Sequence, residues 1–487
     1  MHLEEIAELN AKRICSDCIG EQYLSNDVAA TGVVAKCDYC DQTEATWELE
    51  QLAARIETAF EDHYTRTADQ PDSWQERMLA DRESRYEWFR DGQPTVEAFQ
   101  DAAEVELAVA QDVQSILDDK YACYDPSDMD GETEFSAECH YEEKGASDEA
   151  WQEEWRSFEQ AIQREARFFS RSAAAHLTEV FGRIDSLKTT SKQPLVVDAG
   201  PQYALNHLFR ARVFQSEEPL MNALCRPDLE LGPPPARYAA AGRMNAQGIS
   251  VFYGATSLHS AIAEVRPPVG SRVAVARFNI LRPLRLLDLT ALENACDTGS
   301  IFDPTLKDRL ERVAFLRSVG KRMTRAVMPD DQALDYLATQ AIADFLATEN
   351  EPALDGIVFQ SAQAKEGHNV VLFHKASKVE AMSLPKGARI NASSGYSTED
   401  GYEVDYSVSE VIPKTLPADA PKRRPWVDHL LPFDPADIQG FEERENTLCV
   451  VPDSVEVHFV EWVQVHCTSH QVSRHRFERA MHQDDDF

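Results

Sequence analysis

Residues 237–267 read RYAAAGRMNAQGISVFYGATSLHSAIAEVRP, and the interpretation of the whole chain starts from these residues. Gly242 and Gly248 flank a short polar segment, which is typical of a loop. The β-branched and aromatic residues 249–253 predict a short strand, and we expect Gly254 to end it. The stretch therefore begins as a loop followed by a strand.

A helix is predicted after this strand. Ser257 is a suitable N-cap, and apolar side chains recur on one face as far as Val265. Pro267 and Pro268 end the helix, because proline cannot continue it. Glu264 therefore lies on its last turn, where the macrodipole slightly disfavours a carboxylate.

Short motifs in this stretch resemble the core of the RES domain, the toxin half of bacterial Xre-RES toxin–antitoxin pairs. They are Gly-Arg-Met-Asn at 242–245, Phe-Tyr at 252–253 and Ala-Glu at 263–264. Further segments resemble the opening strand and the closing strands of that domain: Leu-Phe-Arg-Ala-Arg at 208–212, Gly-Ile-Val-Phe-Gln-Ser at 356–361 and Gly-His-Asn-Val-Val-Leu-Phe at 367–373. The resemblance covers about residues 200–385.

This resemblance implies a fold related to ADP-ribosyltransferases and an activity that destroys NAD. The reaction it implies is hydrolysis or phosphorolysis of the bond between nicotinamide and ribose. Strands are predicted at 273–280 and 284–289, and a helix pair at about 303–328 and 331–348. Helices inserted between early and late strands favour an α+β fold over a doubly wound sheet.

The resemblance also points to catalytic residues. Cleavage of the ribosyl bond builds positive charge on the ribose, so a fixed carboxylate stabilises the transition state more than the ground state. Glu264 is the candidate carboxylate. Tyr253 is expected to stack on or orient the nicotinamide. Arg243 is expected beside the reacting group, and Ser361 to place the attacking water or phosphate.

Binding of NAD requires donors for its pyrophosphate. Arg210 and Arg243 supply planar, permanently charged donors, and the resemblance adds Tyr253 and Asn369 as NAD contacts. Other interpretations stay open. Arg243 could bridge loop carbonyls, Tyr253 could be a strand aromatic, and Glu264 could pair with a nearby arginine. An ADP-ribosyltransferase would use the same pocket, and Met244 departs from the aromatic residue common in the family.

Four cysteines near the start of the sequence form a separate motif. Cys15, Cys18, Cys37 and Cys40 have the spacing C-x2-C, eighteen residues, C-x2-C, which can deliver four thiolates to one tetrahedral zinc. With all four ligands cysteine, we expect a structural zinc. The alternative is a pair of disulfides. We expect the other cysteines to be free thiols.

Residues 43–188 are predicted to be mostly helical, with helical periodicity at 47–64, 96–117 and 151–184. The acidic segment 125–149 is interpreted as a solvated loop. Acidic helices after a cysteine knuckle and before a RES-like domain resemble the region called HEPN/RES.

Arg171 and His176 match the R-x4-H pattern of HEPN ribonucleases, in which the histidine acts as general acid or base. Five helical residues turn the chain by about 140°, so the two side chains do not share a face. The other interpretation is that both are ordinary helix residues in a HEPN-like region that is no longer active. A zinc-bearing interaction protein without activity is a related alternative.

Composition restricts the possible partners. The 487 residues include 48 basic and 84 acidic side chains, which gives a formal net charge of -36. Such a surface repels nucleic acid. No long apolar run and no signal-peptide pattern occur, so we expect a cytoplasmic protein. The expected partners are NAD, phosphate, an antitoxin or regulatory protein, and a second copy in a homodimer, with no membrane contact.

The predicted division has four parts: a zinc knuckle at 1–45, a HEPN-like helical domain at 46–190, a RES-like catalytic domain at 195–390, and an extension of unknown role at 391–487. In that extension, strand-like alternation occurs at 395–411 and 447–466. Histidines in the tail have no diagnostic metal spacing, so we interpret them as exposed polar residues.

Overall fold

The computed structural model describes residues 3–81, 83–122, 132–325, 327–328, 330–364, 367–385, 387–399, 401–412, 444–465 and 467–477. The chain forms two compact units. Unit 1 comprises Met1–Asp198, Ala239–Ile249 and Leu284–Gln360, and unit 2 comprises Ala199–Tyr238, Ser250–Pro283 and Ser361–Phe487. No helix in the described part of the chain is long and apolar enough to cross a membrane.

Unit 1 is largely helical. Its helices are α1 (Leu3–Ala11), α2 (Gln22–Thr31), α3 (Leu49–His63), α4 (Ser73–Ala80), α5 (Thr95–Ala103), α6 (Leu107–Tyr121), α7 (Glu149–Arg164), α8 (Arg171–Phe181), α12 (Leu289–Leu292), α13 (Leu306–Thr324) and α14 (Gln332–Thr348). Its strands are β1 (Arg13–Cys15), β2 (Val33–Lys36), β3 (Thr43–Glu48), β4 (Tyr64–Arg66), β5 (Gln93–Pro94), β6 (His140–Glu143), β7 (Lys188–Thr189), β8 (Val196–Ala199, ending on the first residue of unit 2), β12 (Leu284–Asp288), β13 (Ala295–Cys296) and β14 (Gly356–Gln360).

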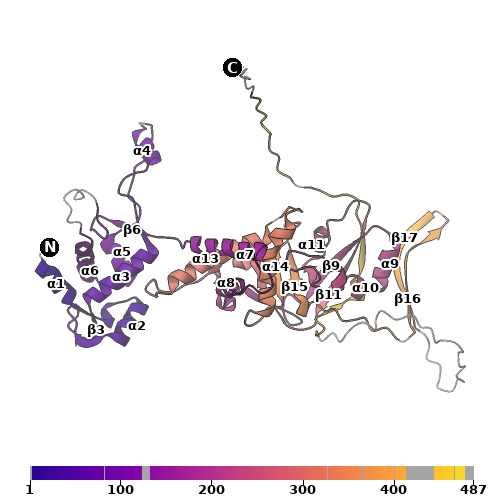
Figure 1. Ribbon diagram of the computed structural model, residues 1–487, viewed down its shortest axis with the longest axis horizontal. Helices are drawn as coiled ribbons and strands as arrows, with labels where there is room; N and C mark the ends of the chain where they lie inside the picture. Colours follow the sequence, from indigo (N-terminus) through magenta and orange to yellow (C-terminus); the bar gives the residue numbers. More distant parts are fainter. Residues whose placement is uncertain are drawn as a thin grey trace, which may run out of the picture. The chain divides into compact units, whose positions relative to one another are not determined.

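Two three-stranded sheets and two strand pairs organise these elements. The strand orders are β1-β3-β2 and β4-β6-β5, β7 pairs with β13 in antiparallel fashion, and β12 pairs with β14 in parallel. Helices α3, α5 and α6 close over an apolar core around Phe60, Phe99 and Phe135 (Figure 1). The rings of Phe60 and Phe99 meet edge to face with centroids 4.7 Å apart. Aromatic burial of this kind stabilises the helical part of the unit.

Unit 2 is built on an antiparallel sheet. Its elements are β9 (His207–Phe214), α9 (Glu217–Cys225), α10 (Pro227–Glu230), β10 (Phe252–Ala255), α11 (Leu258–Glu264), β11 (Arg272–Ile280), β15 (His368–Leu372), β16 (Arg389–Thr398), β17 (Gly401–Val411), β18 (Leu448–Val450), the 3-10 turn η6 (Pro452–Ser454) and β19 (Glu456–Phe459). The strand order is β18-β11-β9-β10-β15, and β19 also pairs with β11. Strands β16 and β17 form a separate hairpin. The α+β prediction is confirmed.

Helix α11 covers one face of this sheet (Figure 1). Ala211, Ala255 and Ala261 meet there with Val273 and Val275. Because side chains alternate between the two faces of a strand, the neighbouring residue Arg210 points to the opposite face. Its guanidinium lies 4.9 Å from the ring centroid of Phe252.

The predicted break of the strand at Gly254 is wrong. Strand β10 continues through Gly254, which pairs with Val370, to Ala255. A Cβ on Gly254 would lie 2.8 Å from Cε1 of Phe252 and 3.2 Å from Cβ of Leu208. The glycine is therefore a point of close packing within the sheet, and close approach is one of the known reasons for a glycine inside a strand.

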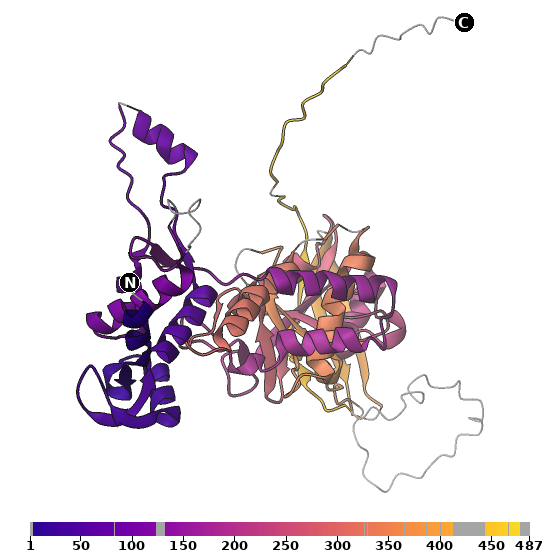
Figure 2. The same ribbon diagram turned by 60° about the vertical axis from the view of Figure 1, so that its left-hand side comes forward.

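The single helical run predicted at 151–184 is also wrong. Helix α7 ends at Arg164 and α8 begins after Ser170, whose hydroxyl accepts a hydrogen bond from the Ala173 N–H. Phe169, which fitted the apolar repeat, is 96% exposed. Figure 2 shows α7 and α8 (magenta) as neighbouring helices, in agreement with their mutual contacts. A strong local cap overrode the periodicity.

The acidic segment 125–149 is only partly the solvated loop that we predicted. Residues 125–131 lie outside the described residues. Farther along, Phe135 and Tyr141 are buried in the aromatic core, and β6 pairs with β4 and β5. Burial of these two aromatic side chains packs the segment against the core, although its overall composition is acidic.

The turn before β15 provides a test of glycine requirements in unit 2. Gly367 and Gly270 both have positive φ, +123° and +85°. A Cβ on Gly367 would collide with the Oγ of Ser260, whereas nothing lies within 4 Å of one on Gly270. We expect Gly270→Ala to lower the free energy of unfolding by about 1 kcal/mol and Gly367→Ala by about 3 kcal/mol, because only the latter adds a clash. Denaturant unfolding of the full chain measures both; equal losses would show that the clash relaxes.

Candidate functional site

A carboxylate and an amide meet at the end of α11. The Nδ2 of Asn369 donates a hydrogen bond of 3.0 Å to Oε2 of Glu264. Among the described residues no arginine forms an ion pair with Glu264, so pairing with a nearby arginine is not its role here. Glu264 is exposed and Asn369 is buried. Asn369 thus holds the Glu264 carboxylate from the buried side, and the carboxylate itself faces the solvent.

Local sequence explains this placement. The Ser257 hydroxyl caps α11 by accepting from the Ser260 N–H at 3.1 Å, as predicted. Asn369 pairs with Ala255 in the sheet register, so its side chain lies on the face that α11 covers. Seven helical residues then carry the chain from the cap to Glu264, directly beside Asn369.

The Oδ1 of Asn369 is buried and accepts no hydrogen bond from the residues that the structure describes. A carboxylate can only accept, which fixes the amide with its NH2 group toward Glu264 and its oxygen away from it. A buried acceptor without a donor costs about 1–3 kcal/mol. The amide oxygen is therefore an acceptor that no donor among the described residues satisfies.

Tyr253 and Ser361 have different surroundings. Tyr253 is half-buried on β10, opposite Val371. Ser361 is buried, and its Oγ accepts hydrogen bonds of 3.2 Å from the N–H groups of Gln363 and Ala364. Ser361 therefore stabilises a turn after β14 by accepting these two hydrogen bonds. Neither of them uses the proton of its own hydroxyl.

Arg210 lies on the face of the sheet opposite to Glu264. Its Nη1 is buried without a hydrogen-bond partner, and among the described residues no carboxylate pairs with it. The pKa of Arg210 is lowered to about 10, mainly by burial; Arg212 contributes to this lowering, and Tyr253 acts in the opposite direction. The guanidinium stays charged at neutral pH, so this buried cation is suited to an anion.

Arg243 belongs to unit 1. Its Nη1 donates 2.7 Å to the carbonyl of Met323, and its guanidinium lies 5.2 Å from the ring centroid of Tyr336. The Thr339 hydroxyl donates 2.6 Å to the Arg243 carbonyl. Met323 lies in α13 and Tyr336 in α14, so these contacts join Arg243 to two helices, whereas the alternative interpretation expected loop carbonyls. Its contact with a pyrophosphate stays a prediction from sequence.

Sequence reasoning did not single out two polar contacts beside the Glu264–Asn369 pair. The Oγ1 of Thr256 accepts 3.1 Å from the His368 N–H, and the Thr256 N–H donates 2.9 Å to the His368 carbonyl. Gly367 approaches Ser260 so closely that no side chain fits there. The sequence offered one signal for these contacts. Gly367 directly precedes the polar start of β15, and a glycine in such a place often marks a point where two parts of the chain approach closely.

One of three comparisons with known proteins finds a match. Residues 207–391 match the family model described as RES domain. This chain contains a RES domain. Searches of curated proteins and of solved structures find no match. The RES domain includes Arg210, Arg243, Tyr253, Glu264, Ser361 and Asn369, all six of the residues selected for NAD chemistry.

Outside the RES domain, four thiols converge in unit 1. The Sγ atom of Cys15 lies 3.6 Å from that of Cys18 and 3.5 Å from that of Cys40, and Cys18 lies 3.8 Å from Cys37. Tetrahedral ligands at about 2.3 Å from a metal are roughly 3.8 Å apart, whereas a disulfide is about 2.05 Å long. The cluster could therefore hold one metal ion, and the disulfide alternative does not fit.

One of these thiols is activated. The pKa of Cys37 is lowered to about 7: burial acts against this, but backbone N–H groups of Tyr39 and Cys40 outweigh it. Metal ligands must be thiolates, and the turn that carries Cys37 provides the required donors.

His176 is buried in an aromatic cage. Only 8% of it is exposed, and its ring centroid lies 5.6 Å from that of Phe158 and 5.9 Å from that of Trp155. Its Nε2 is buried without a hydrogen-bond partner among the described residues, whereas Arg171 is exposed. A general acid or base must reach its substrate, so this geometry favours a structural histidine over a ribonuclease site.

The cage makes stability depend on pH. Burial lowers the pKa of His176, although Glu154, 3.5 Å from its Nδ1, and Glu179 act in the opposite direction. Below about pH 6.5 the unfolded chain binds the proton more readily, so the folded state loses stability as pH falls. We expect His176→Phe to remove this loss. The unfolding midpoint of the variant, compared with that of the unmodified chain, should therefore rise as pH falls from about 7.5 to 5.5. A gain that does not change with pH would contradict the assignment.

Proposed function

We propose that the RES domain cleaves the bond between nicotinamide and ribose in NAD. The RES family is associated with enzymes that act on NAD. The hydrogen bond from Asn369 to Glu264 is the observation that supports the proposal best. It fixes a carboxylate at the surface, beside a buried amide oxygen that has no donor among the described residues.

In this mechanism Glu264 stabilises the positive charge that develops on the ribose as nicotinamide leaves. Asn369 holds Oε2, so Oε1 can face the sugar without reorganisation during the reaction. The unsatisfied Oδ1 of Asn369 accepts a hydrogen bond from a ribose hydroxyl, which recovers the cost of its burial. Water or phosphate then attacks the ribose carbon from which nicotinamide departs.

The other residues are assigned by their chemistry. Tyr253 stacks on the nicotinamide ring. Ser361 donates to the attacking water or phosphate. Arg210 lies on the other face of the sheet, so we assign it no ribose contact; its unpartnered Nη1 is a donor for an anionic group of the substrate, for which the pyrophosphate is our candidate.

The central test is Glu264→Gln. The substitution keeps size but removes the charge, which at typical electrostatic magnitudes costs about 3 kcal/mol, or roughly a hundredfold in turnover. Release of nicotinamide from NAD measures the effect. Glu293→Gln, which neutralises another exposed glutamate, is the matched control and should keep full activity. Full turnover by Glu264→Gln would reject the mechanism.

The same reaction mixtures separate the possible acceptors. Hydrolysis of NAD gives free ADP-ribose. Phosphorolysis gives the 1-phosphate of ADP-ribose, and only when phosphate is present. An ADP-ribosyltransferase would instead attach the ADP-ribose of labelled NAD to protein. All three acceptors meet the same cationic ribose, so Glu264→Gln should lower each of them. The transferase is the alternative that uses the same residues.

We further propose that Cys15, Cys18, Cys37 and Cys40 bind one structural zinc. Their sulfur spacing supports this, and four cysteines leave no open coordination position. Elemental analysis of protein purified without chelator should find one zinc per chain, and Cys37→Ser should lower this content and unfold the knuckle. Cys296→Ser, outside the cluster, is the control. Absence of zinc from the unmodified chain would overturn the assignment.

The four-part division remains our proposal for how these functions are arranged: the metal knuckle at 1–45, the helical region at 46–190, the catalytic region at 195–390, and the extension at 391–487. Toxin-like depletion of NAD in the cytoplasm, restrained by an antitoxin or regulatory protein, is the cellular role that this arrangement suggests.

A further inference from the structure

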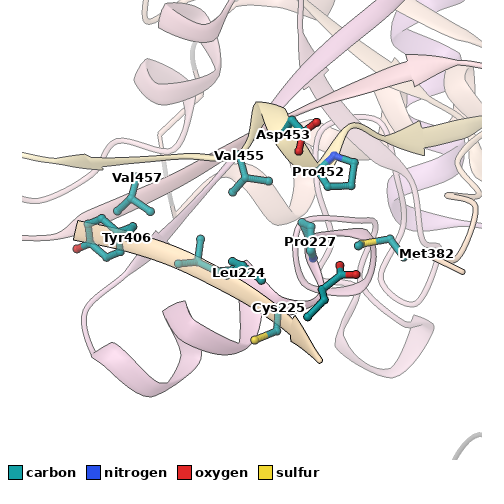
Figure 3. A pocket seen from close by; sticks show the side chains of 11 residues that line it. Leu224, Cys225, Pro227, Met382, Tyr406, Pro452, Asp453, Val455 and Val457 are labelled. Carbon is teal, nitrogen blue, oxygen red and sulfur yellow. The ribbon is translucent and has the colours of Figure 1, made fainter. Parts of the chain in front are cut away.

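A cavity of about 340 Å³ lies in unit 2, apart from the Glu264–Asn369 pair. Figure 3 shows it between β17 and the segment that contains η6 and β19. Its apolar wall includes Leu224, Val408, Val455 and Val457. This volume is at the lower end of the range found for ligand sites.

One face of strand β17 lines the cavity. Tyr406, Val408 and Glu410 line the cavity at intervals of two residues, so they share one face. Val408 on this face is 47% exposed. The hairpin thus has an apolar face that unit 2 covers only in part.

The charged groups that line the cavity are both acidic. Glu410 comes from β17 and Asp453 from η6. Within the described ranges, no lysine, arginine or histidine forms an ion pair with either carboxylate. Apolar walls between two unpaired carboxylates suit an aliphatic group flanked by cations.

We propose that this cavity docks an extended segment of a partner protein in which aliphatic residues alternate with lysine or arginine. Alternate residues of β17 and of β19 (Val455 just before it, and Val457) line the walls, and an extended segment presents its own side chains with the same period. Its aliphatic side chains fill the space between Val408 and Val455. Its cations meet Glu410 and Asp453.

A labelled synthetic peptide of alternating lysine and valine tests the proposal, with a glutamate–valine peptide as its counterpart. Binding to the full chain is measured by fluorescence anisotropy. The buffer contains about 0.15 M salt, which screens long-range electrostatic attraction. Glu410→Lys with Asp453→Lys should weaken the lysine peptide about tenfold or more and favour the glutamate peptide. Glu403→Lys with Asp405→Lys makes the same charge change on β17 at two residues that do not line the cavity, and should alter binding less than twofold.

Cys225 reports the location of the peptide, because it lines the cavity. Burial raises the pKa of this thiol, so alkylation is followed at alkaline pH by mass spectrometry. The lysine peptide should slow alkylation of Cys225 and leave Cys296 unaffected. Val455→Trp should abolish this protection without changing charge. Equal weakening by both charge variants, absence of binding, or protection that survives Val455→Trp would each overturn the proposal.

Discussion

The close approach of α11 to the sheet is the constraint on which the site depends. Ala211, Ala255 and Ala261 meet at this contact, and their small side chains let a seven-residue helix lie directly on the strands. Because Glu264 is the last residue of that helix, the packing determines where its carboxylate emerges. Larger residues at the contact would lift the helix and separate Glu264 from Asn369.

Much of the fold was accessible from sequence because periodicity and caps are local signals. The strand predicted at 273–280 is Arg272–Ile280, and the helix predicted at 331–348 is Gln332–Thr348. The errors occurred where two signals competed. At Ser170 a cap interrupts an apolar repeat, and at Gly254 close packing keeps a glycine within a strand.

The candidate site was predictable in part. The resemblance selected Glu264 and Asn369, but their hydrogen bond depends on the register of β10 with β15. Register follows from pairings between distant segments, which a single sequence does not specify. The same limit applies to Arg210. Its spacing from neighbouring residues was known, whereas the face that it occupies follows only from the pairing of β9 with β11.

The orientation of Asn369 links structure to chemistry. Its NH2 group must point to Glu264, because a carboxylate cannot donate to the amide oxygen. The oxygen is therefore left buried without a donor in the described part of the chain, a state that costs stability in the protein alone. A ligand that donates a hydrogen bond there recovers this cost on binding, and a ribose hydroxyl has the required chemistry. The amide thus serves two purposes at once: it holds the carboxylate in place, and it favours a hydroxyl-bearing sugar beside that carboxylate.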